Sequence, residues 1–319
     1  MMYKLKEKPE DFIVDEVIDV SCSEVGDFSY FVVKKRDYAT PAAVEKIAKF
    51  MHVPIKSIGY AGTKDRHAIT TQWISIEGPE SKLQGFSDNL ITLEFKGKGN
   101  KKIYLGQLEG NKFTITARNI TQKPKAIKQF LNLFDEQRFS MNNVEIGKYI
   151  VKKEFKKAVE KLMESNGYYE RLVKEHYDKT GDAVNSLRKI PMHVLIFFVH
   201  AYQSELWNRT AEELSKTVIN NIEVPIIGFG SEFATDDIRK ITETILREEG
   251  INQRDFILKS FPELSSEGST RKLYTDVTDL KIGELEDDEL NKGMKKVTIS
   301  FFLTKGCYAT MAIRHMFKE

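Results

Sequence analysis

The 319-residue sequence predicts an α+β protein in which a β-rich region is interrupted by a helix-rich one. Apolar and polar residues alternate near both ends of the chain, in "DFIVDEVIDV" and again over residues 297–304. Between them, after Gly147, apolar residues recur at intervals of three and four, which is typical of helices. The economical interpretation is one discontinuous β-rich domain that carries a helical insertion.

The first elements are predicted to be two strands and a helix. The stretches "DFIVDEVIDV" and "SYFVVKKR" have strand-like patterns, and a turn at Gly26 separates them. Thr40 and Pro41 predict the start of a helix, because a threonine hydroxyl can cap free N–H groups and proline suits the first helical position. This helix should end before Pro54.

The segment from 89 to 120 is predicted to be a β hairpin or meander around the glycine-rich "KGKGN". On its second strand, Phe113, Ile115 and Ala117 share one face. Four lysines cluster near the turn: Lys96, Lys98, Lys101 and Lys102. They suit contacts with a phosphate backbone, although a soluble edge strand has the same pattern. The aromatic residues nearby are suited either to stacking on bases or to a core.

The later elements are predicted to be helices followed by a strand. A helical stripe is formed by Phe155, Ala158, Val159, Leu162 and Met163 and ends at Asn166–Gly167. "AYQSELWNRTAEELSKTV" continues this helix-rich region. The β pattern then returns at Val297, Ile299, Phe301 and Leu303.

Composition excludes several classes of protein. With 49 Lys plus Arg against 47 Asp plus Glu, the net charge of +2 argues against a generally basic nucleic-acid-coating protein, so a polyanion site must be local. The cysteines, Cys22 and Cys307, lie far apart, and the six histidines lack metal-site spacing, so we expect no disulfide framework and no metal. The start lacks a signal-peptide core and no apolar run could span a bilayer, which predicts a soluble cytoplasmic protein.

The turn "GYAGTKDRHAITTQ", from Gly59 to Gln72, is the strongest local candidate for chemistry. It lacks the spacing of a phosphate-binding loop. Asp65 lies between Lys64 and Arg66, which favour its ionised form, and the glycines permit unusual backbone geometry. From spacing alone, a solvent-exposed turn with ordinary surface charges is the favoured interpretation. Glycoside chemistry would need a second acid, and the sequence singles out none.

Six ordered motifs shift this balance, because with them the chain resembles the TruD family of tRNA pseudouridine synthases over nearly its full length. The motifs are "KPEDFIVDE" at 8–16, "GYAGTKDRHAITTQ" at 59–72, "LEGNKFT" at 108–114, "FDEQRF" at 134–139, "AYQSELWN" at 201–208 and "GCYAT" at 306–310. Departures from the family pattern occur at Leu133, Ser140 and His315, and the insertion looks short.

The resemblance implies a pseudouridine synthase core with a mixed, mainly antiparallel sheet, formed by 1–149 and 273–319 and interrupted by a helix-rich insertion domain at 150–272. It implies Asp65 as the catalytic nucleophile and Lys6 as its basic partner. It further implies Asn111, Phe113 and Tyr308 as site residues. The candidate RNA contacts are Lys64, Arg66, His67, Lys96, Lys98, Lys101, Lys102 and Arg138.

The activity implied by the resemblance is an isomerase reaction that converts one uridine, uridine 13 of tRNA in this family, to pseudouridine without metal or cofactor. tRNA, with other structured RNA as a further possibility, is the expected partner, and a monomer is favoured. Two alternatives remain open: a non-catalytic RNA-binding or tRNA-folding protein, whose binding would survive Asp65→Asn, and an N-glycosidase, which would release a free base.

Overall fold

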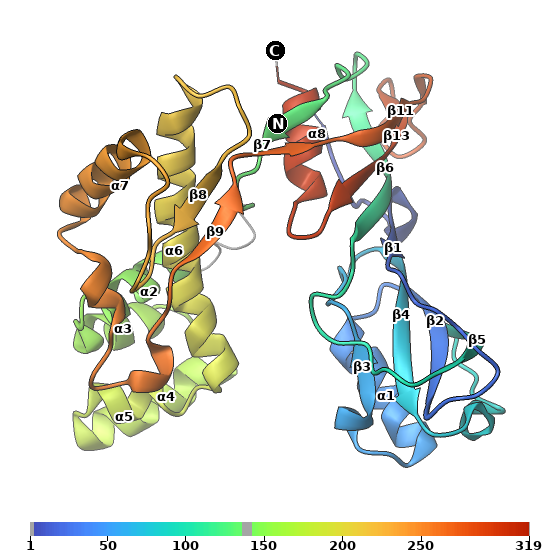
Figure 1. The fold of residues 1–319 in the computed structure, drawn as a ribbon, viewed down its shortest axis with the longest axis horizontal. Coiled ribbons are helices and arrows are strands. Elements are labelled where there is room, and N and C mark those ends of the chain that lie inside the picture. The colour runs from blue at the N-terminus through green and yellow to red at the C-terminus, as the bar shows by residue number, and fades with distance from the viewer. Residues whose placement is uncertain (1–2, 136–141, 319) are drawn as a thin grey trace. The chain divides into compact units, whose positions relative to one another are not determined.

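The computed structural model describes residues 3–135 and 142–318. The chain divides into two compact units, 1–129 together with 276–319 and 130–275 (Figure 1). The units therefore divide at 129/130 and 275/276, whereas the sequence places the boundaries at 149/150 and 272/273. Each boundary falls within a short strand, β7 (Gln129–Leu131) or β10 (Tyr274–Asp276), and these two strands pair with each other.

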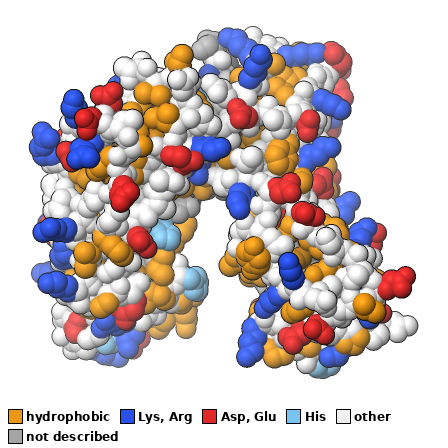
Figure 2. All heavy atoms as spheres, in the orientation of Figure 1, with side chains coloured by type: hydrophobic (Ala, Val, Ile, Leu, Met, Phe, Trp, Pro, Cys, Tyr) orange, Lys and Arg blue, Asp and Glu red, His pale blue; other side chains and the backbone are white. Residues whose placement is uncertain are grey.

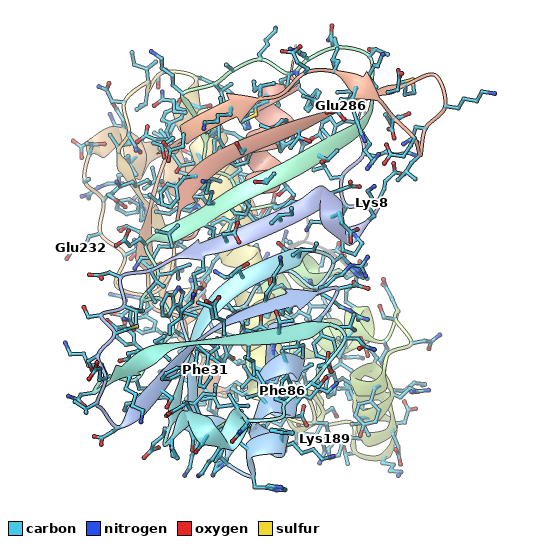
Figure 3. The ribbon with its side chains drawn as sticks, turned by 90° about the vertical axis from the view of Figure 1, so that its right-hand side faces the viewer. Lys8, Phe31, Phe86, Lys189, Glu232 and Glu286 are labelled. Atoms are coloured by element: carbon cyan, nitrogen blue, oxygen red, sulfur yellow. The ribbon has the colours of Figure 1, made fainter. Side chains whose placement is uncertain are left out.

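Unit 1 is built on a mainly antiparallel sheet, to which nine strands contribute within the described residues. The main path runs β11 (Thr278–Ile282), β13 (Lys295–Thr304), β6 (Gly110–Ile120), β1 (Phe12–Val17), β4 (Ile69–Glu77), β2 (Phe28–Arg36), β5 (Ile91–Gly99). In addition, β12 (Glu286–Asp287) pairs with β13, and β3 (Ile58–Tyr60) with β4. Strands β1 and β4 run parallel. Figure 3 shows the sheet with Lys8 near the beginning of β1 and Phe31 on β2. The predicted mixed, mainly antiparallel α+β architecture is confirmed.

The predicted hairpin over 89–120 is wrong. Its two strands form, but β5 pairs with β2 at the edge of the sheet, whereas β6 lies between β1 and β13. The burial of each strand explains the separation, since β5 is mostly exposed while Phe113, Ile115 and Ala117 of β6 are buried. An alternating pattern identifies the buried face of a strand, but it does not identify the neighbouring strands.

Helix α1 (Thr40–Met51) covers part of one sheet face. Val44, Ile47 and Met51 recur at helical spacing and pack with Phe31 of β2 and Ile74 of β4. The helix ends at His52, which adopts the left-handed conformation two residues before Pro54. The last helix of the chain, α8 (Ala309–Met316), also buries an apolar face.

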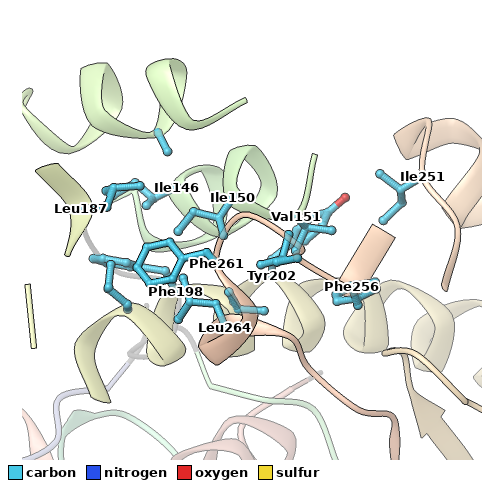
Figure 4. Close-up of a cluster of buried hydrophobic side chains, with 14 of the residues drawn as sticks. Ile146, Ile150, Val151, Leu187, Phe198, Tyr202, Ile251, Phe256, Phe261 and Leu264 are labelled. Atoms are coloured by element: carbon cyan, nitrogen blue, oxygen red, sulfur yellow. The ribbon is translucent and has the colours of Figure 1, made fainter. Parts of the chain in front are cut away.

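Unit 2 is helix-rich and has a hydrophobic core of its own, which Figure 4 shows. Its helices are α2 (Asn143–Val151), α3 (Phe155–Leu162), α4 (Tyr168–Thr180), α5 (Ala183–Leu187), α6 (Met192–Ser215) and α7 (Asp236–Glu249), and β8 (Glu223–Ile226) pairs with β9 (Ser269–Lys272). Gly147 lets α2 approach α6 closely, because a Cβ there would lie 2.0 Å from the carbonyl oxygen of Phe198.

The molecular surface carries interspersed charges of both signs on the face that Figure 2 shows, in keeping with the nearly balanced composition. Among the described residues, no helix is both long enough and apolar enough to cross a membrane.

Candidate active site around Asp65

The central feature of the site is an ion pair between Lys6 and Asp65. Lys6 Nζ lies 3.0 Å from Asp65 Oδ1, and the Asp65 side chain remains 39% exposed. Asp65 lies in the turn between β3 and β4, whereas Lys6 precedes η1 (Pro9–Asp11), a short 3-10 helix. Lys6 Nζ also lies 4.2 Å from the ring centroid of Phe12, a cation–π arrangement. One carboxylate is thus open to solvent on one side and held by a cation on the other.

A second lysine, Lys35, supports the backbone of the turn. Its Nζ donates a hydrogen bond of 2.8 Å to the carbonyl oxygen of Asp65. The residue is 1% exposed, and burial lowers the pKa of its ammonium to about 8; the charge of Asp65 opposes this shift and that of Lys64 adds to it. Lys35 therefore both holds the main chain at Asp65 and brings positive charge beneath the carboxylate.

Lys64 points into the protein rather than toward solvent. Its Nζ lies 2.7 Å from Glu16 Oε1 on β1 and donates a hydrogen bond of 2.6 Å to Asn111 Oδ1 on β6. Its side chain is 5% exposed and that of Glu16 is fully buried, and the other Glu16 oxygen accepts the N–H of Trp73. The structure thus places this predicted RNA contact inside the site.

Thr40 does not cap α1, contrary to the prediction from the sequence. Its hydroxyl accepts the backbone N–H of Lys64 at 3.0 Å and donates to Gln72 Oε1 at 2.8 Å, and the Gln72 amide in turn donates to the carbonyl oxygen of Gly62. No side-chain hydrogen bond caps this described helix start. The hydroxyl is the acceptor that the part-buried N–H of Lys64 needs.

Of the two glycines in the turn, Gly59 has the clearer steric requirement. A Cβ at Gly59 would lie 2.2 Å from the carbonyl oxygen of Ile103, whereas one at Gly62 would meet only Leu108 at an ordinary distance of 3.9 Å. The loop after β5 is therefore packed closely against β3, and the hydrogen bond from the Gly106 N–H to the Ala61 carbonyl oxygen continues this contact.

Asn111 and Phe113 lie on the same face of β6, two residues apart. Asn111 is joined to the site through Lys64, whereas Phe113 is 5% exposed and packs against Phe12 and Phe301 at centroid distances of 6.1 and 5.6 Å. Phe113 thus forms part of the wall behind Phe12 and Lys6.

Tyr308 lies in the loop between β13 and α8 and is partly buried. This loop leaves the sheet beside Asn111, because Leu303 of β13 is the register partner of Asn111. Lys305 anchors the loop through hydrogen bonds to the carbonyl oxygens of Glu109 and Gly106. Tyr308 is thereby attached to the same end of the sheet as Asn111.

The remaining predicted RNA contacts, apart from Arg138, lie at or near the surface of unit 1. Arg66 and His67 are exposed beside Asp65, and His67 Nδ1 lies 2.8 Å from Asp37 Oδ1. Among the lysines of the β5 segment, Lys96 pairs with Glu94, Lys98 with Glu80, and Lys102 donates to the Lys56 carbonyl oxygen. Lys101 is exposed. Arg138 and Ser140 lie outside the described residues.

Several residues that hold the site together were not found by the sequence reasoning, chiefly Lys35, Glu16 and Gln72. Lys35 carried a usable signal, since Phe31, Val33 and Lys35 alternate on one face of β2 and the first two belong to the core. A lysine in register with buried apolar residues indicates a buried cation with a dedicated partner. Within the described residues, no cluster of three or more His, Cys, Asp or Glu side chains has metal-site geometry.

The chain is similar to known pseudouridine synthases along its length. The family model for tRNA pseudouridine synthase D (TruD) matches residues 1–168, 161–222 and 210–316. A Methanocaldococcus jannaschii protein, named as a probable tRNA pseudouridine synthase D 2, is 34% identical, with 98% of this chain and 91% of that protein covered. The tRNA pseudouridine synthase D of Aquifex aeolicus is 28% identical, with 99% and 98% covered.

A solved structure has the same fold. The crystal structure of a Methanosarcina mazei chain designated TruD superposes with a TM-score of 0.78 at 27% identity, covering 99% of this chain and 94% of that one. The sequence motifs, the family model, the relatives and the fold agree. The names of the family and of these relatives give the activity class expected from the sequence, an isomerase that forms pseudouridine in tRNA. The chain belongs to the tRNA pseudouridine synthase D (TruD) family.

Proposed function

We propose that this chain converts one specific uridine of tRNA, uridine 13 by family resemblance, to pseudouridine, with Asp65 as the catalytic nucleophile. The observation that carries the proposal is the Lys6–Asp65 pair, in which a carboxylate is 39% exposed and lies 3.0 Å from a cation. We include in the proposal that the protein acts as a monomer in the cytoplasm.

The reaction breaks the bond between N1 of the base and C1′ of the ribose, turns the base, and joins C5 to C1′; C5 then loses its hydrogen as a proton and N1 gains one, so the product is an isomer of the substrate. A single ionised carboxylate can serve as its central catalyst. Attack at C1′, addition to the base and removal of the C2′ proton all need this carboxylate in nearly the same place. The role that we assign to Lys6 is to hold the Asp65 carboxylate in place through their ion pair and to balance its charge when a nucleotide excludes water.

The neighbouring residues have distinct roles in this proposal. The Asn111 side-chain oxygen is taken by Lys64, so the amide NH2 is the group that we assign to the oxygen atoms of the uracil edge. A uridine flipped out of its stack needs an apolar wall. We assign this wall to Tyr308, and Phe113 supports the site from behind Phe12, since stacking on Phe113 would require its ring to leave its present contacts.

We assign contacts with the tRNA backbone to Arg66, His67 and the four lysines of the β5 segment. The ion pairs of Lys96 and Lys98 are partly exposed and such pairs contribute about 0–1 kcal/mol, so phosphate can replace their carboxylate partners at little cost. Lys64 is left out of this set, because it is buried against Glu16 and Asn111.

The test is incubation of wild type and Asp65→Asn with an unmodified tRNA transcript, followed by chromatographic nucleoside analysis and carbodiimide mapping. Wild type should give pseudouridine at one position and Asp65→Asn none, while Asp287→Asn, the same change at an exposed aspartate outside the site, should retain activity. Binding of tRNA by wild type without product would favour the RNA-binding alternative, and release of free base would favour the N-glycosidase.

A further inference from the structure

The backbone at Lys6 is in a strained conformation that its surroundings must maintain. Its φ is +58°, in the left-handed region, where a residue with a side chain is disfavoured by about 1–2 kcal/mol. Such strain persists when neighbouring contacts fix the chain on both sides. The question is which contacts do so for the lysine that pairs with Asp65.

The chain on both sides of Lys6 is held by Arg118, through its main chain on one side and through its side chain and Asp11 on the other. On one side, Lys4 and Arg118 exchange two backbone hydrogen bonds of 2.9 and 3.0 Å. On the other side, the N–H of Lys8 donates to Asp11 Oδ2 at 3.1 Å, and this same oxygen accepts Arg118 Nε at 2.8 Å. Arg118 therefore holds the arc from Lys4 to Lys8 at its two ends, and Lys6 lies at the middle.

Arg118 is itself fixed by carboxylates from distant parts of the chain. It is 1% exposed, and its Nη1 donates to Asp288 Oδ1 at 2.8 Å and its Nη2 to Glu289 at 3.1 Å. The other Asp288 oxygen accepts the N–H of Asn119 and the side-chain amide of Asn291. Glu289 also pairs with Lys8 Nζ, so the network contacts the segment from Lys4 to Lys8 a second time.

Stability alone is a weak explanation for this cluster. Removing a guanidinium and two carboxylates from water is expensive, and well-packed apolar residues of similar volume often give equal or greater stability. Rigid and directional hydrogen bonds do, however, fix a strained main chain in a way that apolar contacts do not.

We propose that the buried cluster of Arg118, Asp11 and Asp288 is a positioning device that holds Lys6 in its left-handed conformation and so places Lys6 Nζ on Asp65. This inference rests on the proposed function. The hydrogen bonds and ion pairs described for these residues do not include Asp65, so we assign them an action through Lys6.

The test is a double-mutant cycle on tRNA pseudouridylation, in which Asp288→Asn is made in wild type and in Lys6→Met and initial rates are measured over a series of tRNA concentrations, with tRNA in excess over enzyme. In wild type, Asp288→Asn should lower kcat about tenfold with KM nearly unchanged. In Lys6→Met it should lower the rate no further. Asp287→Asn, at the exposed neighbouring residue, is the matched control and should leave kcat unchanged.

A second readout does not depend on activity. The rate at which an amine reagent labels Lys6, followed by peptide mass analysis, should rise severalfold in Asp288→Asn while labelling of the buried Lys35 stays the same. Asn291→Ala, a milder change that removes one hydrogen bond to Asp288, should act in the same direction if Asp288→Asn does not fold.

Equal loss of rate from Asp288→Asn in both backgrounds, or unchanged kcat and Lys6 labelling in a folded variant, overturns the proposal. These outcomes differ from failure of the proposed function itself. In that case Asp65→Asn would remain active, whereas an inactive Asp65→Asn beside a fully active Asp288→Asn would refute the positioning role alone.

Discussion

Lys35 is the residue at which stability and catalysis are expected to conflict. Its ammonium is buried and holds the carbonyl oxygen of Asp65, and burial lowers its pKa to about 8. The pKa of an unfolded lysine is about 10.4. Between these values the unfolded chain binds a proton that the folded chain has lost, so the free energy of unfolding rises with pH in this window. Below pH 8 the protein carries the full cost of the buried charge.

We therefore expect the difference in unfolding free energy between wild type and Lys35→Met to shift in favour of wild type by up to ~3 kcal/mol from pH 8 to 10.5. Urea unfolding at a series of pH values measures it, with Lys34→Met, at the adjacent exposed position of β2, as control. Turnover at pH 7.5 should fall in Lys35→Met, since the carbonyl oxygen of Asp65 loses its donor. Parallel stability curves for wild type and Lys35→Met would contradict the assignment.

Residue by residue, the sequence identifies polar groups more readily than their surroundings. The motifs point to Asp65, Lys6 and Asn111, and the structure joins Lys6 to Asp65 directly and Asn111 to the turn through Lys64. Lys64 was predicted to be an RNA contact, whereas its side chain is paired with Glu16 on β1, which is distant in sequence. Local spacing contains no information on such a partner.

At the level of elements, the start of α1 is joined by hydrogen bonds to the turn that carries Asp65. Thr40 lies in the first turn of the helix, but its hydroxyl serves Lys64 and Gln72. The helix therefore positions the turn. Gln72 on β4 accepts the hydroxyl of Thr40 and donates to the carbonyl oxygen of Gly62, so β4 also helps to hold the turn.

We expect Thr40→Val to lower kcat several-fold, because the part-buried N–H of Lys64 is left without its acceptor one residue from Asp65, at a cost of about 1 kcal/mol. Helix content, measured by circular dichroism, should stay the same, since the hydroxyl does not cap the helix. Thr40→Ser retains the hydroxyl and should retain most activity. A loss of helix content in Thr40→Val with normal kcat would mean that the hydroxyl acts as a cap after all.

Sequence periodicity predicts most elements but not their partners. The strands β1, β2 and β13 and the helix α1 follow from alternating or helical spacing, and all four form. The separation of β5 from β6 could not be inferred, because β6 takes both its neighbours from the two ends of the chain, β1 and β13. Long-range pairing of this kind is decided by the packing of whole faces.

At the level of the whole molecule, the net charge is only +2, so binding of a polyanion must depend on local basic segments. The four lysines of the β5 segment lie in unit 1, which also contains Asp65. Their partners are exposed carboxylates or backbone oxygens, so their charges remain available to phosphate.

Replacing Lys96, Lys98, Lys101 and Lys102 by Ala should make the plot of log binding constant against log salt concentration shallower by about 3, because each phosphate contact contributes roughly 0.7–0.9 to the slope. Filter binding of tRNA at several salt concentrations measures this. A matched set of exposed lysines on α3 and α4 (Lys156, Lys157, Lys174 and Lys179) provides the control. An unchanged slope, or an equal change from the control set, would refute the assignment.

The contacts around Arg118 also have a consequence for protein synthesis. Lys6 is synthesised well before Asp288, Glu289 and Asn291, yet these three residues help to hold the arc that carries it. Strand β6, which supplies Asn111, likewise gains its neighbour β13 only later. A nascent chain therefore cannot hold Lys6 in this arrangement until the segment around Asp288 has emerged, so the proposed active site is completed only after the helix-rich unit has been synthesised.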